Sequence, residues 1–568
     1  MPQHELLLDL LILFGVATVI AVVLQRARQS TIVAYLLTGL LVGPSGLGLI
    51  TNREAIELMA EIGVALLLFT IGIEFSLKKL LQMREVVLGA GSRQVGLTIL
   101  AGVSLGLVIL YPWRESLFWG FLIALSSTAT VLKLLYERQE LDSPHGRAIV
   151  GVLLFQDLCV VPLMALTPAL TAPTGAIAMT VFLALLKSLG VVALILVIAQ
   201  YLFPPLWRTI VQLRNKEIFL IATIFFALGT AWGAHQLGLS LALGAFLAGL
   251  ALSESEFAHQ ILSEILPFRD SFSSLFFISI GMLINLTFVR ANLTVVLTFA
   301  AGIFLLKLFT GAGAVLTLGF PLRTSILVGL ALAQVGEFSF VLLQQGAALN
   351  LIGPAGYQIF LTAAVISLMI TPIVIQVSPA LAARISELPA LLRFFPEPGE
   401  VKLEQKAAPL SDHVIVCGYG LNGRLTASVL RRAGIPYVVL ETNPETVRRA
   451  AAEKEAIFFG DGSNQSILTK AGAARARTLI FAISDPFVLN RAVANARLLN
   501  PDFTILVRTQ RIEDQAMLER AGASLVISEE LEAAEEIIIH LLQVYGLPRK
   551  EAFERIRQVW EQGAARLV

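Results

Sequence analysis

The sequence predicts two parts of different fold class: a polytopic α-helical membrane region and, after it, an α/β domain of the Rossmann type. Of the 568 residues, 56% are hydrophobic and only 15% are charged, against about 25% charged in a typical soluble chain. Apolar runs follow one another from residue 5 to about 380, and short β-branched runs alternate with helical patterns after about 400. This composition excludes a secreted disulfide scaffold, a fibrous repeat and a purely cytosolic enzyme.

The number of cysteines and the net charge exclude further classes of protein. The two cysteines, Cys159 and Cys417, lie far apart in the chain, so they can form neither a disulfide framework nor a cysteine-based zinc site. The net charge is +1, which gives no electrostatic basis for binding nucleic acid.

About thirteen apolar stretches are long enough to cross a membrane, because a crossing helix needs roughly 20 such residues. The start of the chain has no basic n-region and no cleavage motif, so the first stretch is expected to remain as a helix rather than to be a cleaved signal. The expected spans are 5–25, 31–50, 56–76, 87–111, 115–136, 147–169, 178–203, 216–236, 239–253, 270–287, 291–319, 323–345 and 355–378.

The basic residues of the connecting loops predict the orientation, since such residues concentrate on the cytoplasmic side. Loops after even-numbered spans carry only Arg53, Arg114 and Arg290. We therefore expect the N-terminus outside and the C-terminal domain in the cytoplasm of a bacterial inner membrane. Loops after odd-numbered spans carry Arg26, Arg28, Lys78, Lys79, Arg84, Arg138, Arg147, Arg208, Arg214, Lys216, Arg269, Arg323, Arg384 and Arg393.

The organisation along the chain follows from these patterns. Residues 1–384 form the transmembrane domain, 385–411 a linker that mixes prolines and charges, 412–545 the α/β domain and 546–568 a helical tail. Five short runs, at 413–417, 437–440, 456–459, 478–481 and 503–507, alternate with helical patterns and so predict a parallel sheet.

Four ionisable residues lie deep inside expected spans: Asp157, Lys187, Lys307 and Glu337. Each costs a few kcal/mol to insert, so each is a candidate site residue, although it can also simply pair internally and hold helices together. Nothing in the sequence around Lys187 decides between these readings. Asp157 follows Gln156 and stands five residues before a proline, which favours a transport carboxylate over a structural one.

Two spans are expected to be interrupted. The fifth contains Ser126, Ser127 and Thr128, and the twelfth contains Ala333-Gln-Val-Gly-Glu-Phe338. Broken helices near the midplane expose carbonyl oxygens, and transporters build cation sites from them. If the seventh span links two six-helix halves, the two breaks occupy corresponding positions, which is the pattern of inverted repeats.

These motifs, together with Leu275-Phe-Phe-Ile-Ser-Ile-Gly-Met282, resemble the cation:proton antiporter-2 family, and most closely its Kef-type potassium:proton antiporters. The resemblance covers about residues 5–545. It implies an NhaA- or NapA-like fold with crossed broken helices, working as an elevator in which a core domain moves against a dimerisation domain. It also implies that Lys307 can pair with the transport aspartate, and it leaves room for an ancillary regulatory subunit.

The exchange chemistry can be stated from the residues. Burial raises the pKa of a carboxyl group and a nearby ammonium lowers it, so Asp157 poised by Lys307 can hold either a proton or a dehydrated cation. Ser126, Ser127 and Thr128 would supply oxygen ligands, and Gln156 an amide oxygen or a means of orienting Asp157. Glu337 either caps a broken half-helix or touches the ion. With one carboxylate, we expect a one-for-one, electroneutral cycle, although Lys307 as a second proton carrier stays open.

The α/β domain opens with a nucleotide-binding fingerprint. His413-Val-Ile-Val-Cys417 runs into Gly418-x-Gly420-x-x-Gly423, and an acidic residue, Glu441, ends the next strand. Backbone groups from Gly418 to Gly423, Leu421 and Asn422 included, would face the phosphate at the helix N-terminus. Glu441 would accept from ribose hydroxyls and repel a 2′-phosphate. We therefore expect AMP or NAD(H) as a regulatory ligand, rather than NADP(H).

Further residues resemble the regulator-of-conductance nucleotide-binding fold. By that resemblance Asp461 and Ser484 would line the pocket, and the domains would form a homodimer. A degenerate domain without a ligand is the alternative. Glutathione-gated Kef members carry Arg where this chain has Leu421, so nucleotide control is expected and glutathione control is in doubt.

The expected function is thus a monovalent cation:proton antiporter, with K⁺ more expected than Na⁺, and not an enzyme. A nucleotide-gated potassium channel is disfavoured because no Thr-Val-Gly-Tyr-Gly-like filter is present. A membrane-bound NAD-dependent oxidoreductase is disfavoured because no quinone or flavin signature accompanies the nucleotide motif.

Overall fold

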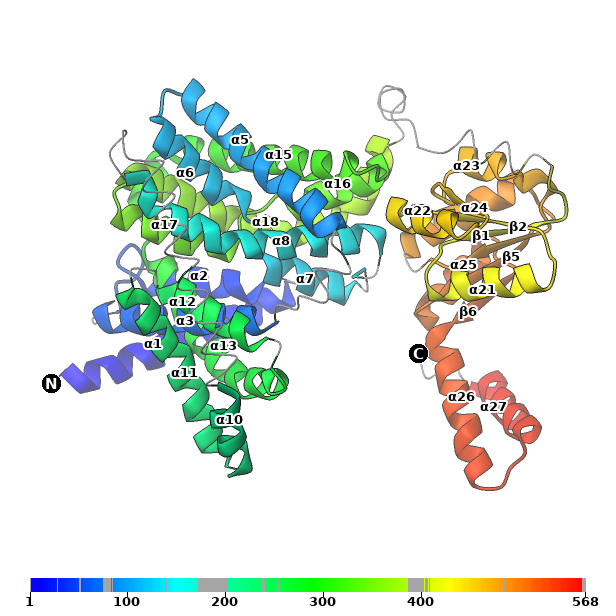
Figure 1. Cartoon of the computed structure of the whole chain (residues 1–568), viewed down its shortest axis with the longest axis horizontal. Helices are drawn as coiled ribbons and strands as arrows, with labels where there is room; N and C mark the ends of the chain where they lie inside the picture. The colour runs from blue at the N-terminus through cyan, green and yellow to red at the C-terminus, as the bar shows by residue number, and fades with distance from the viewer. Residues whose placement is uncertain are drawn as a thin grey trace. The chain divides into compact units, whose positions relative to one another are not determined.

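The computed structural model places most of the chain and confirms the two fold classes (Figure 1). It divides into two compact units: residues 1–135, 148–315 and 326–378 form one, and residues 136–147, 316–325 and 379–568 form the other. The structure describes residues 2–563 except for 28, 51–52, 75–82, 84, 139, 142, 172–189, 191–202, 214, 238–240, 254, 387–402, 404–406, 408 and 484–485.

Up to residue 386, the regular secondary structure of the described residues is entirely helical. Its helices in chain order are α1 (Pro2–Arg26), α2 (Thr31–Val42), α3 (Arg53–Glu74), the π-helix η1 (Glu85–Gly91), α5 (Ser92–Val108), α6 (Trp113–Ala124), α7 (Thr128–Glu137), α8 (Pro144–Leu166), η2 (Pro168–Thr171), α10 (Phe203–Gln212), α11 (Lys216–Gln236), α12 (Leu241–Leu252), α13 (Ala258–Met282), α14 (Leu286–Ala291), α15 (Leu293–Leu316), α16 (Leu322–Ala331), α17 (Glu337–Ala348) and α18 (Pro354–Ser386).

Membrane-spanning character is evident in many of these helices. In the described part of the chain, seven helical segments are long and apolar enough to cross a bilayer, and four shorter apolar helices accompany them. Twelve of the thirteen expected spans coincide with described helices, whereas the seventh, 178–203, lies almost wholly outside the described residues. The thirteen-span count itself therefore stays a prediction.

Small residues set the closest helix contacts. A Cβ atom added to Gly281 of α13 would stand 2.1 Å from the carbonyl oxygen of Leu36 in α2, and one added to Gly39 would stand 1.9 Å from that of Ile278. Such backbone-to-backbone approach is typical of membrane helix pairs, because only glycine leaves room for it. The Ser-Ile-Gly-Met motif is thus explained by packing of α13 on α2.

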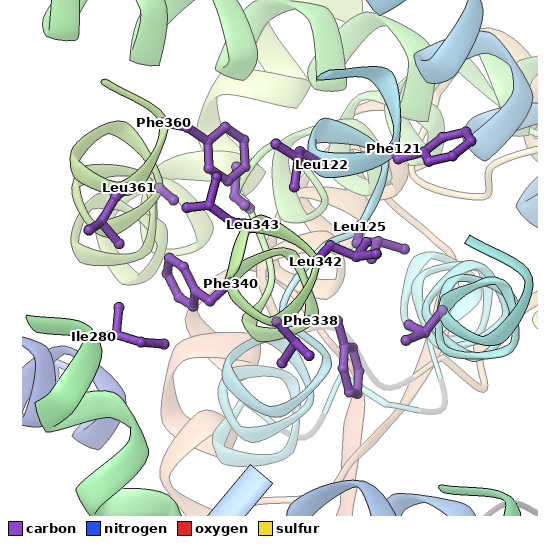
Figure 2. Packing of buried hydrophobic residues seen from close by; sticks show 14 of the residues in the cluster. Phe121, Leu122, Leu125, Ile280, Phe338, Phe340, Leu342, Leu343, Phe360 and Leu361 are labelled. Atoms are coloured by element: carbon purple, nitrogen blue, oxygen red, sulfur yellow. The ribbon is translucent and has the colours of Figure 1, made fainter. Parts of the chain in front are cut away.

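A large apolar cluster surrounds α17. Phe338, Phe340 and Leu343 of α17 are buried, and Figure 2 shows them among side chains of α6, α18 and α13. Because α17 is buried on most of its circumference, it lies in the interior of its unit rather than at its surface.

Both expected helix breaks are present. The fifth span stops at Ala124 and resumes at Thr128, and the twelfth stops at Ala331 and resumes at Glu337. Each span therefore consists of two half-helices, α6 with α7 and α16 with α17, joined by a short non-helical segment. We refer to residues 125–127 and 332–336 as the first and second breaks.

The C-terminal half contains the expected parallel sheet. Its strands are β1 (Val414–Cys417), β2 (Tyr437–Glu441), β3 (Ile457–Phe459), β4 (Thr478–Phe481), β5 (Thr504–Thr509) and β6 (Leu525–Ser528). All pairs are parallel and the order is β3-β2-β1-β4-β5-β6, the doubly wound order in which the cleft lies beyond β1 and β4. The sixth strand was not among the runs identified in the sequence.

Helices complete this half: α21 (Leu421–Arg432), α22 (Pro444–Ala452), α23 (Gln465–Lys470), α24 (Pro486–Leu499), α25 (Gln515–Arg520), α26 (Glu529–Val544) and α27 (Arg549–Gly563). The last two pack on each other through Ile539, Ala552 and Ile556, and form the helical hairpin at the end of the chain (Figure 1).

Candidate functional sites

The two breaks cross and are joined by hydrogen bonds. The amide of Gly336 donates to the carbonyl of Leu125 at 3.1 Å, and the hydroxyl of Ser126 donates to the carbonyl of Leu332 at 3.0 Å. The amide of Ser127 donates to Oε1 of Gln334 at 2.7 Å. The crossing thus brings together two segments that are about 200 residues apart in the sequence.

The carbonyls at the end of α6 accept hydrogen bonds from outside the helix, although no helix continues from it. The last carbonyls of a helix need partners from outside the helix. The carbonyl of Leu122 accepts from the hydroxyl of Ser339 at 2.7 Å, and that of Ala124 accepts from Nε2 of Gln94 at 3.3 Å. The remaining two, of residues 123 and 125, accept from Lys307.

Lys307 lies in α15 and is completely buried. Its Nζ donates to the carbonyls of Ile123 at 2.8 Å and Leu125 at 2.6 Å. A cation at this end of a helix is favourable, because the helix dipole is negative there. The structure therefore places the ammonium on the end of α6, and its pairing with Asp157 stays a prediction.

Asp157 lies in the middle of α8 with only 6% of its surface exposed. The hydroxyl of Thr128 is 3.0 Å from its Oδ1 and 3.2 Å from its Oδ2. Thr128 is the first residue of α7, so the carboxylate stands at the positive end of a half-helix, where a negative charge is stabilised. This arrangement joins the expected transport carboxylate to the first break.

Gln156 hydrogen-bonds the backbone of the first break. Its Oε1 accepts from the amide of Ser126 at 2.7 Å, and its Nε2 donates to Oε1 of Gln94 at 2.7 Å. Gln94 in turn donates to the hydroxyl of Thr98 at 3.1 Å. The amide oxygen of Gln156 is thus engaged, which makes it a residue that positions the first break next to Asp157.

Glu337 opens α17 and is 4% exposed. A carboxylate in the first turn of a helix interacts favourably with the dipole, which agrees with the capping role. Its Oε2 is buried and has no hydrogen-bond partner among the described residues. Both expected roles, capping and ion contact, therefore remain predictions. Lys187 lies outside the described residues.

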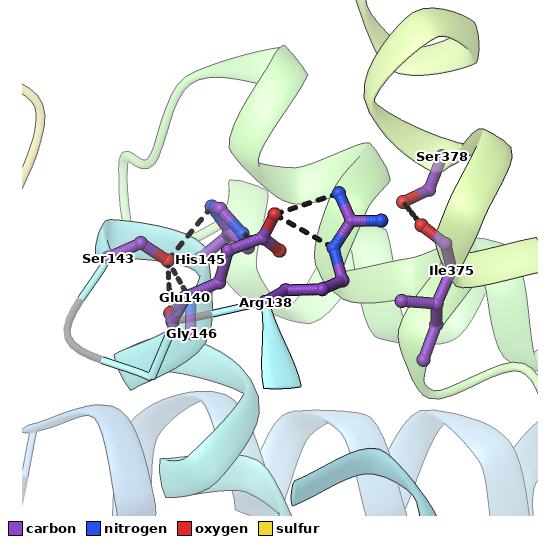
Figure 3. Close-up of polar contacts among 7 residues, drawn as sticks. All are labelled: Arg138, Glu140, Ser143, His145, Gly146, Ile375 and Ser378. Atoms are coloured by element: carbon purple, nitrogen blue, oxygen red, sulfur yellow. Dashed lines mark hydrogen bonds and ion pairs between the residues drawn. The ribbon is translucent and has the colours of Figure 1, made fainter. Parts of the chain in front are cut away.

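A polar cluster braces the loop between α7 and α8 (Figure 3). Nε and Nη2 of Arg138 lie 2.9 and 2.8 Å from Oε1 of Glu140. Nε2 of His145 lies 3.2 Å from Oε2 of Glu140, and the amide of Gly146 donates to the hydroxyl of Ser143 at 2.9 Å. This cluster connects the half-helix after the break to the helix that carries Asp157.

The glycine-rich loop links β1 to α21, and its three glycines differ in what they are needed for. Gly418 has φ +101°, a conformation that favours glycine, and a Cβ on Gly423 would stand 2.0 Å from the carbonyl of Gly418. The fold itself requires these two. A Cβ on Gly420 would meet nothing within 4 Å among the described residues, so their packing does not require a glycine at this position.

Glu441, the last residue of β2, hydrogen-bonds the backbone of the glycine-rich loop. Its Oε2 accepts from the amide of Tyr419 at 2.7 Å, and its Oε1 accepts from the amides of Thr442 and Asn443, both at 2.8 Å. The hydroxyl of Thr442 also lies 3.5 Å from Oε1. Oε2 accepts one of these bonds, from Tyr419, and a carboxylate oxygen has about two acceptor positions.

The phenol of Tyr419 belongs to a second cluster. It donates to Oε2 of Glu455 at 2.9 Å, and Arg431 pairs with the same carboxylate. Burial and the contact with Glu455 raise the pKa of Tyr419 to about 12. The phenol therefore stays protonated and holds the glycine-rich loop against β3.

Three other residues that the sequence predicted at the nucleotide site are described in the structure. Oδ1 of Asp461 accepts from the amide and hydroxyl of Ser463 at 2.8 and 2.7 Å. Leu421 is 66% exposed at the start of α21, and Nδ2 of Asn422 lies 3.4 Å from Oε1 of Glu529. Ser484 lies outside the described residues.

Several site residues were not identified from the sequence. Gln94 and Ser339 are buried and hydrogen-bond the end of α6. Gln334 lies within the predicted second interruption, but its hydrogen bond to Ser127 was not predicted. The sequence signal for such residues is an uncharged polar side chain within an apolar run. This signal is weaker than that of a charged side chain, because an uncharged group costs less to bury. The pairing of Arg508 with Glu529 beside α21 was also not predicted, because the strand before Glu529 was not recognised.

Crossed half-helices with a buried carboxylate, followed by a doubly wound nucleotide-type sheet, define a membrane cation/proton exchanger fold with a nucleotide-binding domain. The comparisons agree. Residues 11–378 match the family model described as sodium/hydrogen exchanger, transmembrane, and residues 414–529 match the TrkA-N domain. The chain belongs to the sodium/hydrogen exchanger family and carries a TrkA-N domain.

Individual relatives are similar over nearly the whole chain. KefB of Alkalimonas amylolytica is 33% identical over 97% of this chain and 83% of that protein. The glutathione-regulated potassium-efflux system protein KefC of Salmonella typhi is 31% identical over 98% of this chain and 88% of that protein. The sodium proton antiporter MjNhaP1 of Methanocaldococcus jannaschii shares the fold, with TM-score 0.52, 16% identity, and coverage of 67% of this chain and all of that one.

Proposed function

We propose that this protein is a Kef-type potassium efflux antiporter that exchanges K⁺ for protons and is regulated by an adenosine nucleotide on its C-terminal domain. The observation that carries the proposal is Asp157, a buried carboxylate held at the start of a half-helix beside two crossed breaks. Whole-chain similarity to potassium-efflux proteins favours K⁺ over Na⁺.

The chemistry is mutual exclusion at one carboxylate. A proton on Asp157 removes the charge that attracts a cation, and a bound cation disfavours the proton. The hydroxyl of Thr128 contacts this carboxylate, so a hard alkali cation at Asp157 would find oxygen, the ligand type that it prefers. Lys307 neutralises the end of α6 in both states, so the crossing persists when the cation leaves.

Three finer features are part of the proposal. One carboxylate with Gln156 beside it supports a one-for-one, electroneutral cycle. An elevator movement of the unit holding the crossed breaks would present Asp157 to either side of a bacterial inner membrane, with the C-terminal domain in the cytoplasm and cellular pH homeostasis as the outcome. The protein acts as a transporter and not as an enzyme.

We also infer a homodimer. Leu421, Leu425 and Val429 recur every fourth residue on α21 and are exposed, and Ile537, Leu541 and Val544 form a similar exposed row on α26. Exposed apolar rows of this kind mark association surfaces. Association with a second copy of the chain would cover both rows.

Exchange in proteoliposomes tests the central proposal. A pH-sensitive dye in the lumen should report proton movement when K⁺, Rb⁺ or Na⁺ gradients are applied, with the largest response to K⁺. Asp157→Asn should abolish the response. Asp9→Asn, the same change at another buried aspartate in α1, should retain it. Proton movement that persists in Asp157→Asn would refute the site, and a response to Na⁺ alone would refute potassium as the substrate.

Calorimetric titration tests the nucleotide part separately. The wild type should bind AMP or NAD(H). Gly420→Ala should lose binding but keep its melting temperature, because the added methyl group enters open space in the free protein. Equal nucleotide binding by Gly420→Ala and the wild type would contradict the proposed phosphate site.

A further inference from the structure

An ion pair stands beside the glycine-rich loop at the junction of β6 and α26. Nε of Arg508, the penultimate residue of β5, donates to Oε1 of Glu529 at 2.6 Å. Nδ2 of Asn422, the second residue of α21, lies 3.4 Å from the same oxygen. One carboxylate oxygen thus contacts both a guanidinium and the first turn of the helix that follows the glycine-rich loop.

This position suits an anion. The N-terminus of α21 carries no side-chain cap, and uncapped helix N-termini attract carboxylates and phosphates alike. Arginine recognises both groups through the same planar set of N–H donors. The hydrogen bond from Arg508 lowers the pKa of Glu529, so the carboxylate remains charged at neutral pH.

The N-terminus of α26 lacks a side-chain capping hydrogen bond. Ser528 is its N-cap residue, yet its side chain makes no capping hydrogen bond, and its buried hydroxyl has no partner among the described residues. A serine in this position normally accepts from the second or third amide of the helix. The start of α26 is therefore held by the side chains of Glu529 and Glu530 rather than by its cap.

We propose that Glu529 is a built-in competitor of the nucleotide phosphate, which displaces it from Arg508 and Asn422 when the nucleotide binds. This inference rests on the proposed nucleotide site. Phosphate approaching Gly420 meets the same two donors that hold Glu529, and the two anions repel each other. Binding therefore transfers Arg508 and Asn422 to the phosphate and releases the first turn of α26 from β5 and α21.

The adjacent acid provides a matched control. Glu530 also lies in the first turn of α26, but its Oε2 accepts from the amide of Ile512 at 3.1 Å. Glu530→Gln removes one negative charge from the same helix turn without touching Arg508. It separates competition at Arg508 from a general change in charge.

Calorimetry of the full-length protein in nanodiscs tests the proposal, with AMP and adenosine as probes. Glu529→Gln should bind AMP about 3- to 10-fold more tightly than the wild type, with adenosine binding unchanged because adenosine lacks the phosphate. Arg508→Gln should bind AMP about 10-fold more weakly. Glu530→Gln should match the wild type for both probes, and unchanged adenosine binding shows that each variant is folded.

Three outcomes would overturn the proposal. AMP affinity that is unchanged in Glu529→Gln, or raised equally in Glu530→Gln, excludes competition while leaving the nucleotide site intact. AMP binding that requires Mg²⁺ and is lost in Glu529→Gln would make Glu529 a metal ligand instead. A wild type that binds neither AMP nor NAD(H) refutes the nucleotide part of the proposed function, and this inference with it.

Discussion

At the level of single residues, one missing methyl group decides whether the breaks can cross. A Cβ on Gly336 would stand 2.5 Å from both the carbonyl carbon and the carbonyl oxygen of Ser126, a separation that real Cβ atoms do not show. The amide of Gly336 also donates to Leu125. The glycine of the second break is therefore required by the backbone of the first break, independently of any ion.

Gly336→Ala should consequently destabilise the protein by about 1–3 kcal/mol, the range for overpacking an interior site. It should also slow cation-driven proton movement, because the first break shifts beside Asp157. Melting curves and the proteoliposome assay measure the two effects. Gly302→Ala in α15, where the added methyl group meets nothing within 4 Å, is the control. Equal stability of the two variants would contradict this explanation of Gly336.

At the level of elements, half-helices are joined to their surroundings by short polar loops. The loop between α7 and α8 depends on Glu140, which is 8% exposed and contacts Arg138 and His145. Burial alone would raise the pKa of Glu140, but hydrogen bonds from His145 and Arg138 outweigh it, and the pKa lies below its ordinary value of 4.5. A carboxyl group with a lowered pKa stabilises the folded state above its unfolded pKa and stops doing so as the pH falls.

Glu140→Gln should therefore lower stability near neutral pH by about 1–3 kcal/mol, the range for hydrogen bonds to charged groups. The difference from the wild type should shrink as the pH falls below 4.5, where the carboxyl group of the unfolded chain becomes protonated, and should vanish as the pH falls through the lower pKa of the folded state. Melting temperatures of both proteins between pH 3 and pH 7 would show this. Glu256→Gln removes a pair that is 66% and 60% exposed and should have little effect at any pH.

Most helices and strands were predictable from the sequence, but one strand and the partners of buried polar side chains were not. Both breaks were predicted, since small hydroxyl residues and glycine interrupt otherwise apolar helices, and the sheet was predicted from its β-branched runs. Strand β6 was missed because its Leu525 and Ile527 face outward at the sheet edge. The partners of Lys307 and Gln156 could not be predicted, because a buried polar side chain finds its partner through tertiary packing, which local sequence does not specify.

At the level of the whole molecule, the number of titratable carriers sets the stoichiometry. Asp157 is the carboxylate at the first break, and the neighbouring Gln156 is an amide. One proton per K⁺ moves no net charge, so the transport rate should not respond to membrane voltage. Initial rates in proteoliposomes should be the same with and without a permeant ion that collapses the voltage. A strong change in rate would indicate a second proton carrier, with Lys307 and Glu337 the candidates.

The order in which the chain is synthesised matters for the end of α6. Of the groups that satisfy its last carbonyls, Gln94 precedes α6, whereas Lys307, Gly336 and Ser339 follow it by more than 180 residues. A nascent chain that has reached residue 300 has a fifth span whose polar end still lacks most of these partners, at a depth where lipid supplies none. Assembly of this region must therefore await the last third of the membrane region, and a chain truncated before Ser339 will lack the hydroxyl that binds the carbonyl of Leu122.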